Sequence, residues 1–228
     1  MVLGVIPARG GSKGLSRKNI LPFCGRPLID WSIAAAEQSQ LIDRFVVSTE
    51  DPEIAEVAQI AGAEVLPRPV GLATDDATTL AVLMHVLEHI PADIVVLLQP
   101  VCPIRINNLV DRAIQRFLDS DADSLATGYI LKSIEWGTHN NLSRQEIEGI
   151  FTDNGNVYVH RAEVLRQGRW YGEHLERMIV EHHYSFDIDD EVDFLAAEAV
   201  MKKLLEAMDW AMPHERAMVA ESQGDGKK

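Results

Sequence analysis

This sequence of 228 residues has few cysteines, few aromatic residues and no long uninterrupted apolar run. Its two cysteines, Cys24 and Cys102, are far apart and outside any C-x-x-C pattern, which argues against a disulfide framework and a structural zinc site. No apolar stretch approaches the ~18 residues that span a bilayer, and the N-terminal residues lack the apolar core of a signal peptide. We therefore expect a cytoplasmic protein with two buried thiols and no membrane partner.

Basic residues are scarce as well, with 21 Lys and Arg against 35 Asp and Glu and a formal charge of −14. Such a chain repels the phosphates of nucleic acid and anionic lipid, so we expect neither as a partner. The hydrophobic content of 46% is enough for one sizeable core. We expect a single domain over residues 1–210 and a C-terminal tail at 211–228.

Short β-branched runs alternate with helical patterns in the first 127 residues. We expect strands at 2–6, 44–49, 64–66, 93–99 and 123–127, and helices at 28–38, 52–61, 76–90 and 107–118. This order predicts an α/β fold with a doubly wound, mostly parallel sheet, whose ligands bind beyond the strand C-termini. Further strands are expected in EGIFT and NVYVH. A last helix is expected from Asp190 to about Met208, with Val192, Leu195, Ala196 and Ala199 on its apolar side.

A basic, glycine-rich segment, Pro7 to Asn19, follows the first expected strand. Residues 1–29 contain five basic side chains and no acidic one. Glycines let backbone N–H groups approach an anion, while Arg9, Lys13 and Lys18 can neutralise several phosphate charges. The segment therefore predicts a polyphosphate site. The alternative is a surface turn that carries solvated cations.

Four known motifs can be compared with this sequence, and none fits fully. The segment has neither the order of a P-loop nor a G-x-G-x-x-G dinucleotide fingerprint. It does match G-x-S-x-G, the hydrolase elbow, with Ser12 as nucleophile, but only one strand precedes it. His85 and His89 match the zinc pattern H-x-x-E-H around Glu88, without an evident third ligand.

Two carboxylates near the C-terminus, Asp187 and Asp189, alternate around Ile188. In an extended backbone, residues i and i+2 point to the same side, so both carboxylates can meet one hard cation. Mg²⁺ takes one or two carboxylates together with substrate phosphates, so this pair and the basic segment predict two halves of one metal-triphosphate site. Helix capping is the alternative for the pair. It is the expected role of the neighbouring residues, which are Asp190, Glu191 and Asp193.

Taken in order, these motifs resemble the acylneuraminate cytidylyltransferase family, the CMP-sialic acid synthetases and their bacterial nonulosonate relatives. The resemblance spans roughly residues 2 to 205. It rests on I-P-A-R-G-G-S-K-G-x-x-R-K-N at 6–19, V-V-S-T-E-D at 46–51, R-P-x-x-L-A-T-D at 68–75, L-L-Q-P at 97–100, N-G-x-x-Y at 154–158 and D-I-D-x-E-x-D-F at 187–194.

The resemblance implies a role for each matching residue. Arg9, Lys13 and Lys18 would be the catalytic cations that hold the CTP phosphates. Further nucleotide contacts would come from Gly11, Ser12, Asn19, Arg68 and Thr79. Gln99 and Tyr158 match positions that contact the sugar acid, and Arg144 matches the carboxylate-binding arginine. Asp187 and Asp189 would bind Mg²⁺.

The implied reaction joins the anomeric hydroxyl of a nine-carbon 2-keto-3-deoxy sugar acid to the α-phosphate of CTP and releases pyrophosphate. Alternatives are a KDO-specific or other sugar nucleotidyltransferase, and a CTP-binding module without turnover. Family members are commonly homodimers, and residues 129–150 are the candidate dimerisation arm. The sequence departs from the family pattern at Val101 and Cys102, at Asp76, Thr78 and Thr79, and at Asn156. Asn156 is expected to add a polar group near the sugar pocket.

Overall fold

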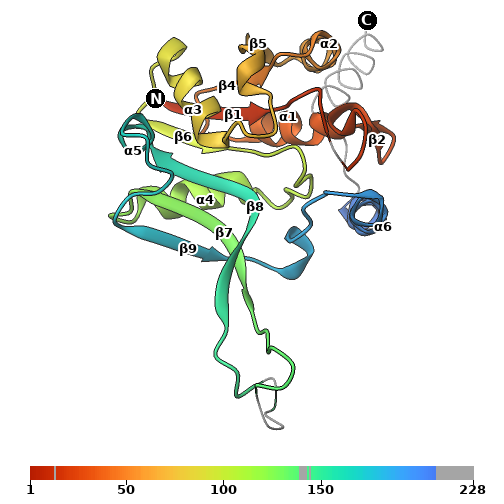
Figure 1. The fold of residues 1–228 in the computed structure, drawn as a ribbon, viewed down its shortest axis with the longest axis vertical. Coiled ribbons are helices and arrows are strands. Elements are labelled where there is room, and N and C mark those ends of the chain that lie inside the picture. Colours follow the sequence, from red (N-terminus) through yellow and green to blue (C-terminus); the bar gives the residue numbers. More distant parts are fainter. Residues whose placement is uncertain (13, 139–142, 144, 209–228) are drawn as a thin grey trace, which may run out of the picture.

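The computed structural model describes residues 1–12, 14–138, 143 and 145–208, and a seven-stranded sheet crosses it (Figure 1). Its strands are β1 (Val2–Pro7), β4 (Arg44–Thr49), β5 (Glu64–Pro67), β6 (Ile94–Leu97), β7 (Ser124–Leu131), β8 (Ile150–Arg161) and β9 (Leu175–Ile179). Their order across the sheet is β5-β4-β1-β6-β8-β7-β9. The pairs β5-β4, β4-β1, β1-β6 and β7-β9 are parallel, and β8 is antiparallel to both its neighbours. The mostly parallel sheet is as predicted.

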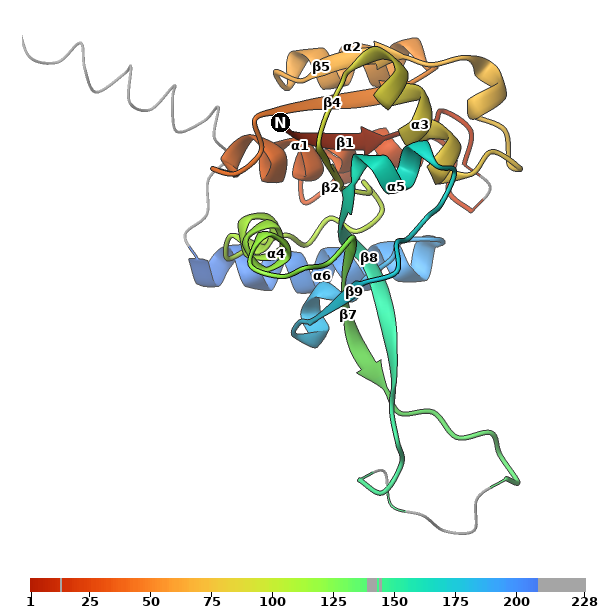
Figure 2. The same cartoon turned by 90° about the vertical axis from the view of Figure 1, so that its left-hand side faces the viewer.

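Helices cover both faces of this sheet, as a doubly wound fold requires (Figures 1 and 2). They are α1 (Leu28–Gln38), α2 (Pro52–Ile60), α3 (Thr79–His89), α4 (Leu109–Leu118), α5 (Ala162–Arg166) and α6 (Glu191–Met208). Short 3-10 helices are η1 (Lys18–Ile20), η2 (Val70–Leu72) and η3 (His182–Tyr184), and β2 (Pro22–Phe23) pairs with β3 (Arg26–Pro27). In the described part of the chain, no helix has the length and apolarity of a membrane span.

The central strands are apolar throughout because they supply two cores at once. Val96 of β6 and Leu98, the residue directly after this strand, pack in one core with α1, α2, α4 and α6. Val95 and Leu97 point to the other face and pack with α3 and α5. Alternate residues of a strand point to opposite faces, so a strand covered on both sides reads as a continuous hydrophobic run. This is why the expected strands before residue 100 match the observed ones closely.

Capping residues decide where the helices begin. The Asp51 carboxylate accepts hydrogen bonds from the Glu53 and Ile54 N–H groups at 3.0 Å, and Pro52 opens α2. The Thr78 hydroxyl accepts from the Ala81 N–H, so α3 begins at Thr79 rather than at the expected residue 76. Hydrophobic periodicity alone does not distinguish the loop from the first turn.

The structure differs from the expectation in the second half of the sheet. NVYVH and the last three residues of EGIFT belong to one strand, β8, which runs without a break from Ile150 to Arg161. The pairing register of β8 against β7 shifts between Ala126 and Gly128, and the two strands are paired on both sides of this shift. The outer parts of β7 and β8 form a hairpin that projects from the body (Figure 1). It covers the described part of the predicted arm at 129–150. The predicted tail at 211–228 lies outside the described residues.

Helix α6 packs with a different side from the one its sequence pattern indicates. Val192 and Leu195 are 73% and 58% exposed. Phe194 contacts Phe23 edge-on with ring centroids 5.4 Å apart, and Ala197 and Met201 are buried. The apolar residues of this helix occupy both sides, so only the tertiary contact decides which side is covered.

Candidate active site

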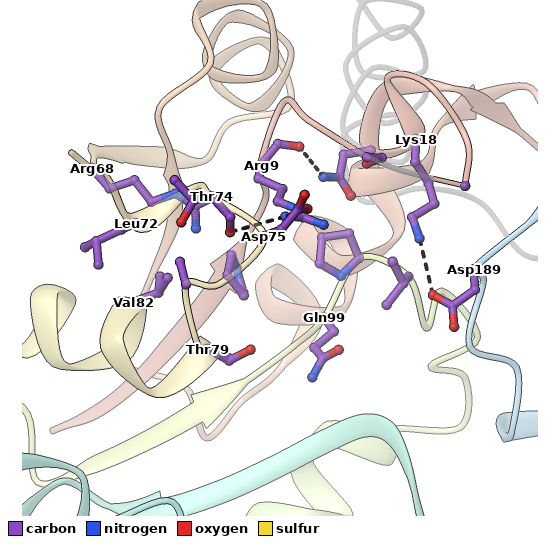
Figure 3. A pocket seen from close by; sticks show the side chains of 17 residues that line it. Arg9, Lys18, Arg68, Leu72, Thr74, Asp75, Thr79, Val82, Gln99 and Asp189 are labelled. Atoms are coloured by element: carbon purple, nitrogen blue, oxygen red, sulfur yellow. Dashed lines mark hydrogen bonds and ion pairs between the residues drawn. The ribbon is translucent and has the colours of Figure 1, made fainter. Parts of the chain in front are cut away.

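A cavity of about 460 Å³ opens at the carboxyl ends of β1, β5 and β6 (Figure 3). β1 leads to α1 on one face of the sheet, whereas α3 on the other face leads into β6. The cavity lies beyond the carboxyl ends of these strands, where ligands bind in open α/β sheets. It is lined by Pro7, Arg9, Ser12, Gly14, Lys18, Asn19, Arg68, Leu72, Thr74, Asp75, Ala77, Thr79, Val82, Gln99, Pro100, Val101 and Asp189. Predicted site residues from four separate segments therefore meet around one space.

The segment after β1 turns back so that both its ends face this cavity. Arg17 adopts a left-handed conformation (φ 56°) immediately before η1. The turn directs Lys18 and Asn19 toward the cavity that Arg9 and Ser12 also line. The buried Asn19 amide donates a hydrogen bond to the Arg9 carbonyl at 2.9 Å and joins the two ends of the segment.

Arg17 itself anchors the segment and is directed toward α2. Its guanidinium donates to Asp51 at 2.5 and 2.8 Å and to Glu53 at 2.5 Å. The hydrogen bond from Arg17 lowers the pKa of the Asp51 carboxyl to about 2, and Asp51 in turn raises the pKa of Arg17. This pair therefore holds the segment against the first turn of α2 and contributes no free cation to the cavity.

Lys18 joins the basic segment to the acidic one. Its ammonium donates to the Ile188 carbonyl at 2.5 Å and lies 3.8 Å from an Asp189 carboxylate oxygen. Ile188 is fully buried and its N–H donates to the Val101 carbonyl, which orients the extended segment from 187 to 189. Residues two apart then share the outward side, so Asp187 and Asp189 flank the buried isoleucine.

The two carboxylates differ in their surroundings. Asp189 lines the cavity, whereas Asp187 lies beside it with a carboxylate oxygen 3.9 Å from the Cys102 sulfur. Desolvation first, and then the negative charge of Asp189, raise the pKa of Asp187. The neighbouring Asp190 and Asp193 carboxylates accept hydrogen bonds from backbone N–H groups at the start of α6, which confirms their predicted capping role.

Two further arginines line the cavity, and each forms an ion pair with a carboxylate. Arg68 follows β5, is buried, and pairs with Glu50 at 2.9 Å. Arg9 pairs with Asp75 at 2.9 Å and also contacts the Thr74 carbonyl at 3.3 Å. In the view of Figure 3, Arg9 lies between Arg68 and Lys18, so three cations follow one another across the cavity.

Gln99 extends into the cavity just beyond β6, and a buried cation holds its backbone. Arg105 is 8% exposed and donates to the Gln99 carbonyl at 2.7 Å, the Asn156 carbonyl at 2.8 Å and the Ser32 hydroxyl at 2.9 Å. Burial lowers its pKa to about 10. A buried charge is tolerated when it is hydrogen-bonded, and here each of the three guanidinium nitrogens donates to one acceptor.

The segment around Tyr158 is more buried than its predicted role requires. Tyr158 is 7% exposed, lies outside the cavity lining, and donates its hydroxyl hydrogen to Asp153. Burial and this bond raise its pKa. Asn156 is fully buried and its amide donates to the Ile104 and Tyr184 carbonyls at 2.9 Å. The expectation that Asn156 adds a polar group to a sugar pocket is therefore wrong, because its amide is used to join backbone segments.

The predicted residues divide into three groups. Arg9, Ser12, Lys18, Asn19, Arg68, Thr79, Gln99 and Asp189 line the cavity, whereas Gly11, Tyr158 and Asp187 are not part of its lining. Lys13 and Arg144 lie outside the described residues. Sequence reasoning did not assign Thr74, Asp75 or Glu50, although R-P-x-x-L-A-T-D and V-V-S-T-E-D contain them.

The alternative zinc pattern brings two imidazoles together on α3. The His85 and His89 ring centroids are 4.4 Å apart, and His89 Nδ1 lies 2.8 Å from the His85 carbonyl. Within the described ranges, no three His, Cys, Asp or Glu side chains form a cluster suited to a metal ion. Any metal bound by Asp187 and Asp189 would therefore depend on ligands supplied by a substrate or by water.

Comparison with known proteins connects this geometry to a family. The family model described as Cytidylyltransferase matches residues 3–206. The chain is 30% identical over 229 residues to a CMP-N,N'-diacetyllegionaminic acid synthase of Legionella pneumophila, with 91% of this chain and 99% of that one covered. It is 27% identical over 223 residues to an N-acylneuraminate cytidylyltransferase of Escherichia coli O18:K1:H7. That alignment covers 89% of this chain and 52% of the relative, so the chain spans about half the length of that enzyme.

Solved structures extend the likeness to the fold. A CMP:2-keto-3-deoxy-manno-octonic acid synthetase, solved as a complex with CTP, superposes with a TM-score of 0.73 at 18% identity. The match covers 90% of this chain and 99% of the other. A cytidylyltransferase from Leptospira borgpetersenii gives a TM-score of 0.60 at 17% identity, over 90% and 95% of the two chains.

Proposed function

The chain belongs to the cytidylyltransferase family, and from this premise we propose that it transfers CMP from CTP to a sialic-acid-like 2-keto-3-deoxy sugar acid. One observation carries the proposal. The basic segment after β1 and the acidic segment before α6 meet at a cavity located at the carboxyl ends of parallel strands. The similarity to a CMP-N,N'-diacetyllegionaminic acid synthase of Legionella pneumophila and to an N-acylneuraminate cytidylyltransferase of Escherichia coli supports a nonulosonate as the acceptor.

In this proposal the nucleotide lies across the row of cations. Arg68 and Thr79 would contact the cytidine, and Arg9 and Lys18, with Lys13, would hold the triphosphate. The anomeric hydroxyl oxygen of the acid attacks the α-phosphorus, the bond from that phosphorus to the bridging oxygen breaks, and pyrophosphate leaves. The hydroxyl proton passes to a general base. Fixed cations lower the barrier because they stabilise charge that develops on the leaving group.

Mg²⁺ is the proposed cofactor, with Asp187 and Asp189 as its protein ligands. Hard oxygen donors in a pair suit this ion, which commonly completes its shell with phosphate oxygens and water. The mutual repulsion of the two carboxylates also fits a bound cation, since a positive charge would relieve it. When bound, Mg²⁺ would neutralise phosphate charge. The chain's own contribution is to hold the two carboxylates beside Lys18.

The sugar acid would lie next to the α-phosphate, on the side of Gln99 and Tyr158. Arg144 is proposed to bind its carboxylate. The preferred acid is proposed to have nine carbons, and the cytoplasm is the proposed compartment.

A homodimer is proposed as the functional form, with the β7-β8 hairpin as its arm. Large apolar side chains are exposed along this hairpin and the adjoining edge strand β9, including Ile130, Trp136, Ile150 and Ile179. Trp136 is 98% exposed, which is unusual for a residue that contributes so much apolar area. Analytical ultracentrifugation of the wild-type chain and of Trp136→Ser with Ile179→Ser tests this interface. A monomeric wild-type chain at micromolar concentration contradicts the proposal.

The activity itself is tested with radiolabelled CTP and a panel of acids. The panel contains N-acetylneuraminate, legionaminate, pseudaminate, KDN and the eight-carbon KDO, each with and without Mg²⁺. We expect pyrophosphate and a CMP-sugar from at least one nine-carbon acid. Turnover of KDO alone supports the KDO-specific alternative. CTP binding by calorimetry without any product supports the binding-module alternative, and competition by UTP, GTP and ATP identifies the base.

A further inference from the structure

Glu50 lies directly behind the cavity and connects two of its walls. It follows β4, and its side chain is 13% exposed. One carboxylate oxygen accepts a hydrogen bond from the Gly10 N–H at 2.7 Å. The other accepts from Arg68 Nε at 3.0 Å and lies 2.9 Å from Arg68 Nη2. Both oxygens are therefore engaged, one by the basic segment after β1 and one by the arginine after β5.

The charge of Glu50 compensates a guanidinium that would otherwise be isolated. The Arg68 side chain is only 3% exposed, and Arg9 is close enough to repel it electrostatically. Burial lowers the pKa of Arg68, and the hydrogen bond that Arg68 donates to Glu50 opposes this effect. A buried cation without a partner is costly, so Glu50 is what lets the buried Arg68 lie close to Arg9, which has its own partner in Asp75.

We propose that Glu50 is a positioning residue that sets nucleotide specificity by holding Arg68 and the Gly10 N–H at fixed places around the cavity. This inference rests on the proposed function and extends it to a residue that does not line the cavity. An arginine neutralised by Glu50 attracts phosphate weakly, yet its remaining N–H groups still suit the neutral oxygen and nitrogen acceptors of a base. Glu50 thereby separates a base-binding arginine from the phosphate-binding cations Arg9 and Lys18.

The same two strands carry a matched ion pair outside the cavity. Arg44 opens β4 and Glu64 opens β5, and the arginine donates to both carboxylate oxygens at 2.8 and 2.5 Å. Both side chains are nearly half exposed. Glu64→Gln therefore removes the same charge and the same kind of pair from the same two strands, at the end that does not contact the nucleotide.

Two substitutions separate the effect of the Glu50 charge from the effect of its side-chain length. Glu50→Gln keeps the length of the side chain, but its neutral amide has a single acceptor oxygen for Gly10 and Arg68. Glu50→Asp keeps the charge on a chain one methylene shorter, which cannot span both partners. Calorimetry with the full chain measures the dissociation constants of CTP and of inorganic tripolyphosphate, which lacks a base.

For Glu50→Gln we expect CTP affinity to fall about tenfold, the loss typical of one charged hydrogen bond, while tripolyphosphate binds as well as before or better. For Glu50→Asp we expect CTP affinity to fall without any gain for tripolyphosphate. Glu64→Gln should leave both constants unchanged. Equal losses for both ligands, or unchanged CTP binding in Glu50→Gln, overturn the inference. A wild-type chain that binds neither ligand overturns the proposed function, and this inference with it.

Discussion

The α-carbon of Gly14 lies directly against the backbone of Asp189. A β-carbon added to Gly14 would come within 2.0 Å of the Asp189 carbonyl oxygen, far inside van der Waals contact. Two segments about 175 residues apart in the sequence thus touch through backbone atoms. Glycine at position 14 is required by this close approach.

Gly14→Ala should displace the acidic segment from the cavity, because the carbonyl that the methyl group meets belongs to the backbone and cannot rotate away. We expect turnover to fall at least tenfold while the chain stays folded. The measurement is kcat together with the thermal unfolding temperature. Gly71→Ala is the control, since a β-carbon there meets no atom within 4 Å. Equal activity of the two variants contradicts this account.

Asp189→Asn should shift the Mg²⁺ dependence of the reaction. Removing one anionic oxygen weakens the metal's attachment, so we expect a higher Mg²⁺ requirement and a loss of tenfold or more in kcat. Rates across a Mg²⁺ titration test this. The control is Asp190→Ala, which removes a capping side chain of α6. It should lower the free energy of unfolding by about 1 kcal/mol and leave the Mg²⁺ concentration for half-maximal rate unchanged. Identical titrations for the wild type and Asp189→Asn would refute the metal assignment.

Asp75→Asn should bind CTP more tightly than the wild type. The Asp75 carboxylate pairs with Arg9 at 2.9 Å, so the triphosphate must compete with it for the guanidinium. Both groups are partly exposed, and such a pair contributes roughly 0.2–1 kcal/mol, which predicts a dissociation constant lower by a factor of up to about five. Calorimetry at low and high salt measures it, with the neighbouring Asp76→Asn as control. Weaker binding in Asp75→Asn would show that the carboxylate helps rather than competes.

His160 should make the protein less stable in mild acid. Its ring is 2% exposed and stacks on Tyr158 with centroids 6.2 Å apart. Burial lowers its pKa from 6.5 to about 4. Between these values the unfolded chain takes up a proton that the folded chain resists. The stability contributed by the neutral ring is therefore complete above pH 6.5 and is lost by about pH 4, on the order of 3 kcal/mol.

Denaturant unfolding from pH 7.5 to 4.5 measures this effect as the difference between the wild type and His160→Gln. The variant should lose less stability on acidification, because glutamine does not titrate. The exposed His182→Gln should follow the wild type. Parallel pH profiles for the wild type and His160→Gln would assign the acid sensitivity to other groups.

Arg105→Lys should destabilise the fold and weaken the hydrogen bonding that holds the Gln99 backbone in place. An ammonium donates from a single point, whereas the guanidinium reaches three acceptors on separate segments. We expect a loss of about 3 kcal/mol in the free energy of unfolding and a raised KM for the sugar acid, with a smaller change in the KM for CTP. Urea unfolding and two-substrate kinetics measure the two effects. A stable variant with unchanged kinetics contradicts this role.

The sequence predicted the first half of the fold well and the second half less well. β1, β4 and β6 are buried on both faces, and strands buried in this way have continuous apolar runs in the sequence, between amphipathic helices. β9 is a short edge strand with exposed Leu175 and Ile179, so it carries no such signal. α6 has apolar residues on two sides, and the pattern indicated the side that remains exposed.

The candidate site divides in the same way. Residue types and their order along the chain determined that cations follow the first strand and that carboxylates precede the last helix, because glycine-rich basic loops and alternating acids are local patterns. Only the tertiary structure decided which charges meet: Arg9 with Asp75, Arg68 with Glu50, Lys18 with Asp189, and Arg105 with no acid among its hydrogen-bond acceptors in the described chain. Electrostatic energy depends on distance and burial in space, and neither quantity is contained in the linear order of residues.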